Sequence, residues 1–130
     1  MTESEVIESA FMMGAGAVSV FTIYISVIFA YLAAAYFVGA NLTRFQASVL
    51  TGLFIATETV SAAACTASVL GWEKLIALYP SVLNTIPFYT LGIWHKYMAG
   101  LLAVGIVVGL YFMHNIRSIK GKDNLNESAT

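Results

Sequence analysis

A long uncharged run dominates the N-terminal part of the chain. No Asp, Glu, Lys or Arg occurs between Ala10 and Thr43, whereas a helix needs only about 20 apolar residues to cross the roughly 30 Å of hydrocarbon in a bilayer. Of the 130 residues, 59% are apolar and 10% are charged. A soluble chain of this length could not bury so much apolar surface. The sequence therefore predicts an all-α integral membrane protein.

Three segments are predicted to cross the membrane within a single membrane domain. Gly14 and Gly16 weaken helix formation, so we expect a short surface helix over Glu3–Met13 before the first span. The predicted spans are residues 17–39, 45–70 and 91–113, followed by a polar tail over 115–130. The lipid bilayer is therefore the expected environment of most of the chain.

The first two spans are joined by a short polar turn. Thr43 followed by Gln46 has the form of a capping box, which satisfies free amides where a helix begins. Asn41-Leu42-Thr43 also matches a glycosylation acceptor, but so short a turn favours the cap. We expect the second helix to begin here.

The connection over residues 71–90 is too apolar for an ordinary loop. Trp72, Tyr79, Phe88 and Tyr89 gather in it, as in the aromatic belt at a membrane–water interface. The sequence predicts an aromatic elbow in the headgroup plane between the second and third spans. A re-entrant dip is the alternative.

Basic residues predict the orientation. With three crossings, four of the six Lys and Arg residues lie on the side of the C-terminal tail, and two lie on the other. Basic residues favour the cytoplasmic side. We therefore expect the N-terminus outside and the C-terminus in the cytoplasm.

Glu58 is the charged residue that is hardest to explain. It lies near the middle of the second span, about 18 Å from either end. The eight Val, Leu, Ile and Phe residues from Ala47 to Leu70 supply about −2 to −5 kcal/mol, and one central carboxylate costs about +2.5 to +3.5 kcal/mol. The span is therefore marginal as a lone lipid-facing helix.

Several polar groups are predicted to lie near Glu58. At 100° per residue, Thr51, Ser61 and Cys65 share its helix face, and Tyr24 and Tyr31 lie at similar depth on the first span. These residues are candidates for a proton or cation pathway. The alternative is a protonated carboxyl group that is hydrogen-bonded between helices and fixes their packing.

Small residues mark predicted helix-packing surfaces. The second span carries Ser61 to Ser68 with Ala62 and Cys65, and the third carries Gly105 and Gly109. Such surfaces let helix backbones approach closely in lipid. Three helices cannot use all of these faces on one another, so a homo-oligomer or a larger membrane complex is expected.

These features favour a non-enzymatic oligomeric or accessory membrane protein, with an ion channel or proton/cation pathway through Glu58 as the alternative. A haem or quinone anchor is a weaker third hypothesis. His95 and His114 are about 28 Å apart along one helix and cannot share an iron within the chain. We expect no cofactor, no metal, no enzymatic activity, and no nucleic-acid partner, because no dense basic tract is present.

Overall fold

The computed structural model describes residues 2–83 and 92–129. In this part of the chain there are three long helices and one short one: α1 (Glu3–Val38), α2 (Arg44–Ala77), α3 (Pro80–Leu83) and α4 (Trp94–Ser128). The three long helices are long and apolar enough to cross a membrane, as the sequence predicts. The described part of the chain is thus all-helical, and its three long helices suit a multi-pass membrane protein.

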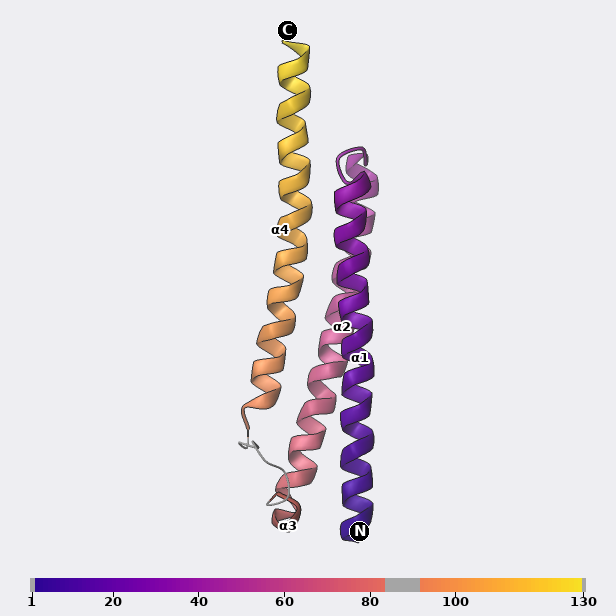
Figure 1. The fold of residues 1–130 in the computed structure, drawn as a ribbon, viewed down its shortest axis with the longest axis vertical. Coiled ribbons are helices and arrows are strands. Elements are labelled where there is room, and N and C mark those ends of the chain that lie inside the picture. The colour runs from indigo at the N-terminus through magenta and orange to yellow at the C-terminus, as the bar shows by residue number, and fades with distance from the viewer. Residues whose placement is uncertain (1, 84–91, 130) are drawn as a thin grey trace.

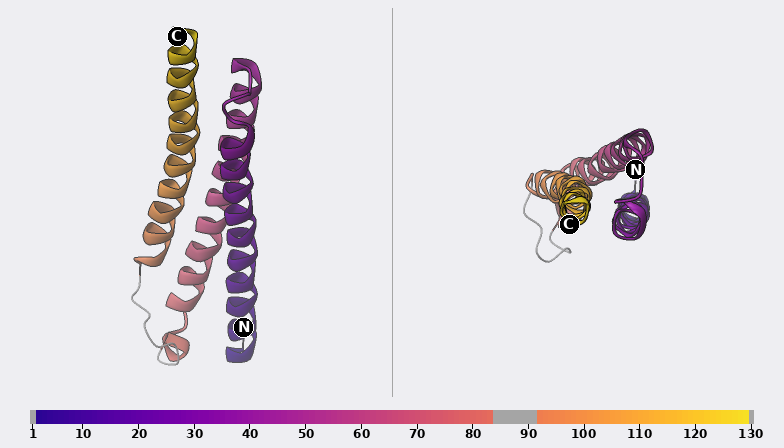
Figure 2. Two further views of the ribbon diagram at one scale, coloured as in Figure 1. Left: turned by 45° about the horizontal axis from the view of Figure 1, so that its top comes forward. Right: turned by 90° about the horizontal axis from the view of Figure 1, so that it is seen from above.

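The long helices run side by side and alternate in direction along the chain, so the two termini lie at opposite ends (Figure 1). Seen end-on, they form a triangle rather than a flat layer (Figure 2). The most extensive pairing is between α1 and α2, and α4 packs against both. We refer to the end with the α1–α2 turn as the upper end and the end with α3 as the lower end, as in Figure 1.

The buried residues follow a seven-residue repeat. On α1, Ala10, Ala17, Tyr24 and Tyr31 are buried, each seven positions after the last. The buried positions of α2 are Ala47, Phe54, Glu58, Ser61, Cys65, Glu73 and Ile76. A seven-residue repeat keeps one seam of each helix facing its partners, as in left-handed coiled coils. The register of this seam turns Glu58 inward.

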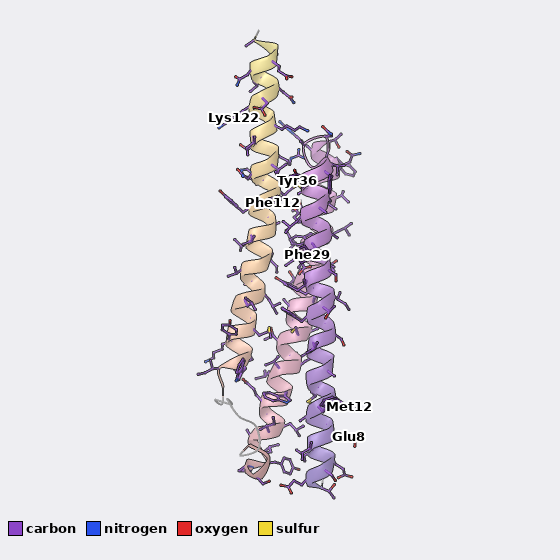
Figure 3. The ribbon with its side chains drawn as sticks, viewed as in Figure 1. Glu8, Met12, Phe29, Tyr36, Phe112 and Lys122 are labelled. Atoms are coloured by element: carbon purple, nitrogen blue, oxygen red, sulfur yellow. The ribbon has the colours of Figure 1, made fainter. Side chains whose placement is uncertain are left out.

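Large apolar side chains lie on the outside. Phe29 and Tyr36 on α1 are 68% and 67% exposed, and Figure 3 labels both. The interior holds small or polar side chains at many positions, including Ala17, Ala35 and Ser61. Close packing of small residues with bulky apolar groups outside suits a lipid environment, where burial of apolar area between helices gains little.

The N-terminal region forms part of α1. The expected separate surface helix over Glu3–Met13 is not shown, because these residues are the first turns of one unbroken helix that continues to Val38. Thr2 and Glu5 form a capping box at its start. Gly14 and Gly16 do not interrupt the helix, because a single glycine costs only about 1 kcal/mol and the neighbouring turns pack against α2.

The two helix connections differ. The predicted capping box of Thr43 and Gln46 is confirmed at the start of α2. The backbone N–H of Gln46 donates to Thr43 Oγ1 at 3.2 Å, and the backbone N–H of Thr43 donates to Gln46 Oε1 at 3.0 Å. The second connection includes α3, and residues 84–91 of the predicted aromatic elbow lie outside the described residues. The elbow is therefore not shown. Beyond the predicted third span, α4 continues through the polar tail to Ser128.

Candidate functional site

Glu58 is enclosed by the three long helices. It is 0% exposed, and along α2 it lies about 21 Å from Arg44 and about 22 Å from Glu73, the charged residues near its two ends. Neither carboxyl oxygen has a hydrogen-bond partner within the described residues. A buried polar group without partners costs about 1–3 kcal/mol. The structure thus places an isolated acid at the middle of the bundle.

Three of the hydroxyl groups predicted near Glu58, those of Tyr24, Tyr31 and Thr51, form hydrogen bonds to other groups. The Tyr24 hydroxyl donates to the carbonyl of Leu102 on α4, and the Tyr31 hydroxyl shares a 2.9 Å hydrogen bond with Thr51 Oγ1. These hydroxyls therefore join helices and leave the carboxyl group without a donor.

Ser61 and Cys65 follow Glu58 on the buried seam of α2. Ser61 is 9% exposed and Cys65 is 0% exposed. The Cys65 thiol lies 3.7 Å from the Ala17 carbonyl oxygen and donates a weak hydrogen bond to it. The structure therefore brings Tyr24, Ser61 and Cys65 to the interior with Glu58, whereas Thr51 and Tyr31 pair nearer the upper end.

Gly105 and Gly109 lie where α4 meets aromatic rings of the other helices. A Cβ atom at Gly105 would collide with the Tyr24 hydroxyl. A Cβ atom at Gly109 would lie 2.8 Å from Cζ of Phe54, whose ring stacks on Tyr31 with centroids 3.9 Å apart. Both glycines thus make room for rings that fill the interior.

A carboxylate joins the lower ends of α2 and α4. Glu73 is 4% exposed, and its Oε1 accepts from the amides of Trp94 at 3.0 Å and His95 at 3.3 Å. Its Oε2 lies 2.6 Å from His95 Nδ1. Glu73 therefore caps α4 from another helix, since Ile93 at the N-cap makes no side-chain cap bond. We call these contacts the Glu73 clamp.

The Glu73 clamp is not predicted by the sequence patterns. The sequence indicates only that Glu73-Lys74 and His95-Lys96 could pair at the headgroups, as an exposed and therefore weak pair, and it makes His95 a weak candidate haem ligand. It does not indicate that Glu73 is buried or that it caps α4. One signal is present: α4 begins after Gly92 and Ile93 with no Ser, Thr, Asp or Asn at the cap position. A helix start without such a residue leaves free amides that need an acceptor from elsewhere.

An arginine holds the upper ends together. Arg117 Nη1 on α4 donates to the carbonyls of Gly39 and Leu42, both at 3.2 Å. These carbonyls belong to the end of α1 and the following turn, and α1 has no basic residue in its own last turn. A cation at a helix C-terminus is stabilised by the helix dipole and by the free carbonyl groups.

Two grooves follow each other along the outer side of the α2–α4 pair. The upper groove has a volume of about 580 Å³ and includes Arg44, Ser48, Ile55, Leu110, His114 and Arg117 in its lining. The lower groove has a volume of about 510 Å³ and is lined by Thr59, Ala62, Ala63, Thr66, Ala67, Leu70, Ala99, Ala103 and Ile106. The predicted packing residue Ala62 is half-buried: it lines the lower groove and also packs against the buried cluster of Tyr24, Cys65 and Leu102, whereas Cys65 lies wholly in the interior.

The two histidines lie at opposite ends of the bundle. His95 belongs to the Glu73 clamp, and His114 lines the upper groove. Within the described residues, no group of three His, Cys, Asp or Glu side chains lies close enough together to hold a metal ion.

Comparisons with known proteins give no match for this chain: no family model fits it, and no curated protein and no solved structure is similar to it.

Proposed function

We propose that the protein is a non-enzymatic membrane protein that assembles with a second copy of itself through the lower groove. The observation that carries this proposal is the chemistry of the groove. Five alanines and two threonines line it, together with Leu70 and Ile106. Ala63, Ala67 and Ala103 are exposed on the outer surface of the bundle.

The composition of the groove favours a helix over lipid as its occupant. Small side chains let a further helix approach closely, and the Thr59 and Thr66 hydroxyls can bond across the contact instead of facing hydrocarbon. The α2 span is also the least hydrophobic of the three by mean hydropathy. An accessory subunit of a larger membrane complex would use the same surface.

Enlarging an exposed alanine of the groove tests the assembly. We expect Ala63→Leu to reduce the oligomeric fraction about tenfold, because the added side chain holds a partner helix away. The measurement is the oligomeric state in mild detergent and by photobleaching of labelled protein in liposomes. Ala33→Leu is the matched control, since Ala33 is exposed on α1 outside the groove. Monomeric wild-type protein in both media, or an equal loss in the control, contradicts the proposal.

We propose the following placement in the membrane. The upper end carries Arg44, Arg117, Lys120 and Lys122, and this basic excess favours the cytoplasm, with the N-terminus outside. Trp72 and Trp94 mark the opposite interface, where Met13 and Gly14 of α1 line a pocket with them. The turns of α1 before Met13 then extend into the headgroup layer, as does the aromatic elbow after α2.

A proton pathway through Glu58 is the second candidate function. Its support is a fully buried carboxyl group with no hydrogen-bond partner within the described residues. An unpaired charge in the membrane interior is costly, so the neutral acid is the expected resting form. Tyr24, Ser61 and Cys65 are the buried polar side chains that a transient path would use.

A flux measurement separates the two roles of Glu58. If the acid carries protons, Glu58→Gln lowers proton flux into liposomes about tenfold or more, because the amide cannot release a proton. Thr57→Val, an exposed change one position away, should leave the flux unchanged. Absence of flux in wild-type protein removes this candidate. If Glu58 carries no protons, Glu58→Met should raise the free energy of unfolding by about 1–3 kcal/mol, because the substitution removes an unpaired buried polar group.

A further inference from the structure

The upper groove combines a basic end with an apolar floor. Arg44, His114 and Arg117 line its outer end, whereas Ile55 and Leu110 line the part nearer the middle of the bundle. No Asp or Glu is among its lining residues in the described part of the chain. The groove therefore presents a positive charge that its own walls do not neutralise.

The arginine donors are available to an anion. Arg117 bonds the Gly39 and Leu42 carbonyls through Nη1. A guanidinium group carries five N–H donors, so the two bonds made through Nη1 leave further donors of Arg117 for an anion. Arg44 is exposed and belongs to the first turn of α2, where the helix dipole adds positive potential. Phosphate oxygens are suitable acceptors for such paired donors.

The length of the upper groove along α2 matches the thickness of one leaflet of a bilayer. From Arg44 to Ile55 the groove follows α2 for about 16 Å, which is about half of the roughly 30 Å of hydrocarbon. A phosphate at the arginines would therefore place an acyl chain along Gly52, Ile55 and Leu110. Basic pockets between membrane helices are known sites for anionic lipid headgroups.

We propose that the upper groove binds one anionic phospholipid of the leaflet at the α1–α2 turn. Arg44, Arg117 and His114 hold its phosphate, and one acyl chain lies in the groove between α2 and α4. The lipid site shares no lining residue with the lower groove, so a test of lipid binding can fail without affecting the proposed assembly, and the reverse.

Lipid binding to the delipidated protein tests the proposal. We expect phosphatidylglycerol to bind about tenfold more tightly than phosphatidylcholine when measured by native mass spectrometry and by the shift in Tm. Arg44→Gln should weaken binding of phosphatidylglycerol about tenfold, the value of one charge-assisted hydrogen bond, and should leave phosphatidylcholine unaffected. Arg117→Gln should do the same where the variant folds.

Lys122→Gln is the matched control, because it removes one positive charge from α4 beyond the α1–α2 turn, where Figure 3 labels Lys122. Its affinity for phosphatidylglycerol should stay within about twofold of wild type. An equal loss in Lys122→Gln, or equal binding of both lipids, overturns the proposal. Competition by millimolar inorganic phosphate would identify a site for free phosphate and would also overturn it.

Discussion

Glu73→Ala should lower the free energy of unfolding by about 3 kcal/mol. The carboxylate accepts from two amides of α4 and contacts His95 Nδ1 at 2.6 Å. A hydrogen bond to a charged group contributes about 1.5–3 kcal/mol, and removal of the acceptor leaves donors unpaired. Denaturation in mixed micelles measures the loss. The fluorescence of Trp94, whose amide bonds Glu73, reports local opening of the clamp.

Two variants sharpen the test of the Glu73 clamp. Glu73→Gln keeps one oxygen for the amides but loses the negative charge, so we expect about half of the effect of Glu73→Ala. Glu8→Ala removes the same charge from an exposed position of α1, which Figure 3 labels near the lower end. It should change the free energy of unfolding by less than about 0.5 kcal/mol. Equal effects of Glu73→Ala and Glu8→Ala would refute the clamp.

Gly105→Ala should lower the free energy of unfolding by about 2 kcal/mol. The added Cβ would collide with the Tyr24 hydroxyl and lie 3.0 Å from Ile28 Cδ1. Tyr24 is 2% exposed and packs with Cys65 and Leu102, so its rigid ring cannot turn aside. Overpacking of this kind costs about 1–3 kcal/mol, and the buried bond to the Leu102 carbonyl is lost as well.

The same helix supplies the control for Gly105. A Cβ atom at Gly100 would meet no atom of the described residues within 4 Å, so Gly100→Ala should leave stability unchanged or raise it by up to about 1 kcal/mol. In a Tyr24→Phe background the colliding oxygen is absent. Gly105→Ala should then cost much less than in wild type, which a double-mutant cycle measures as coupling. Additive effects would show that Tyr24 and Gly105 do not meet.

The membrane class and the number of long helices follow from composition and hydropathy alone. The uncharged run from Ala10 to Thr43 requires a helix that hides its backbone polar groups from lipid. The cap at Thr43 and Gln46 is also predictable, because both partners lie within one turn of each other. Local sequence is sufficient for such features, since the interacting residues are neighbours along the chain.

The candidate site is predictable only in part. Glu58 stands out by its charge, and helix periodicity places Ser61 and Cys65 on its face. The hydrogen-bond partners of Tyr24 and Tyr31 could not be predicted. Several groups on neighbouring helices could bond each hydroxyl, and which of them lies close enough depends on how the helices are rotated by packing. The roles of Glu73 and Arg117 escape prediction for the same reason, since their bonds join residues more than 20 positions apart.

Hydropathy and charge along the chain are enough to predict that it enters a bilayer, how many long helices it forms and which acid lies near the middle of a span. These properties depend on the free energy of transferring each side chain from water to hydrocarbon. This free energy adds up over the residues of a segment, whichever residues are their neighbours. Packing between the helices sets which way each seam turns. This packing buries Glu58 among the three helices, brings Glu73 to the start of α4 and leaves the α2–α4 grooves on the outside. The reason is that the rotation of each helix about its axis is set by the fit of side chains between helices.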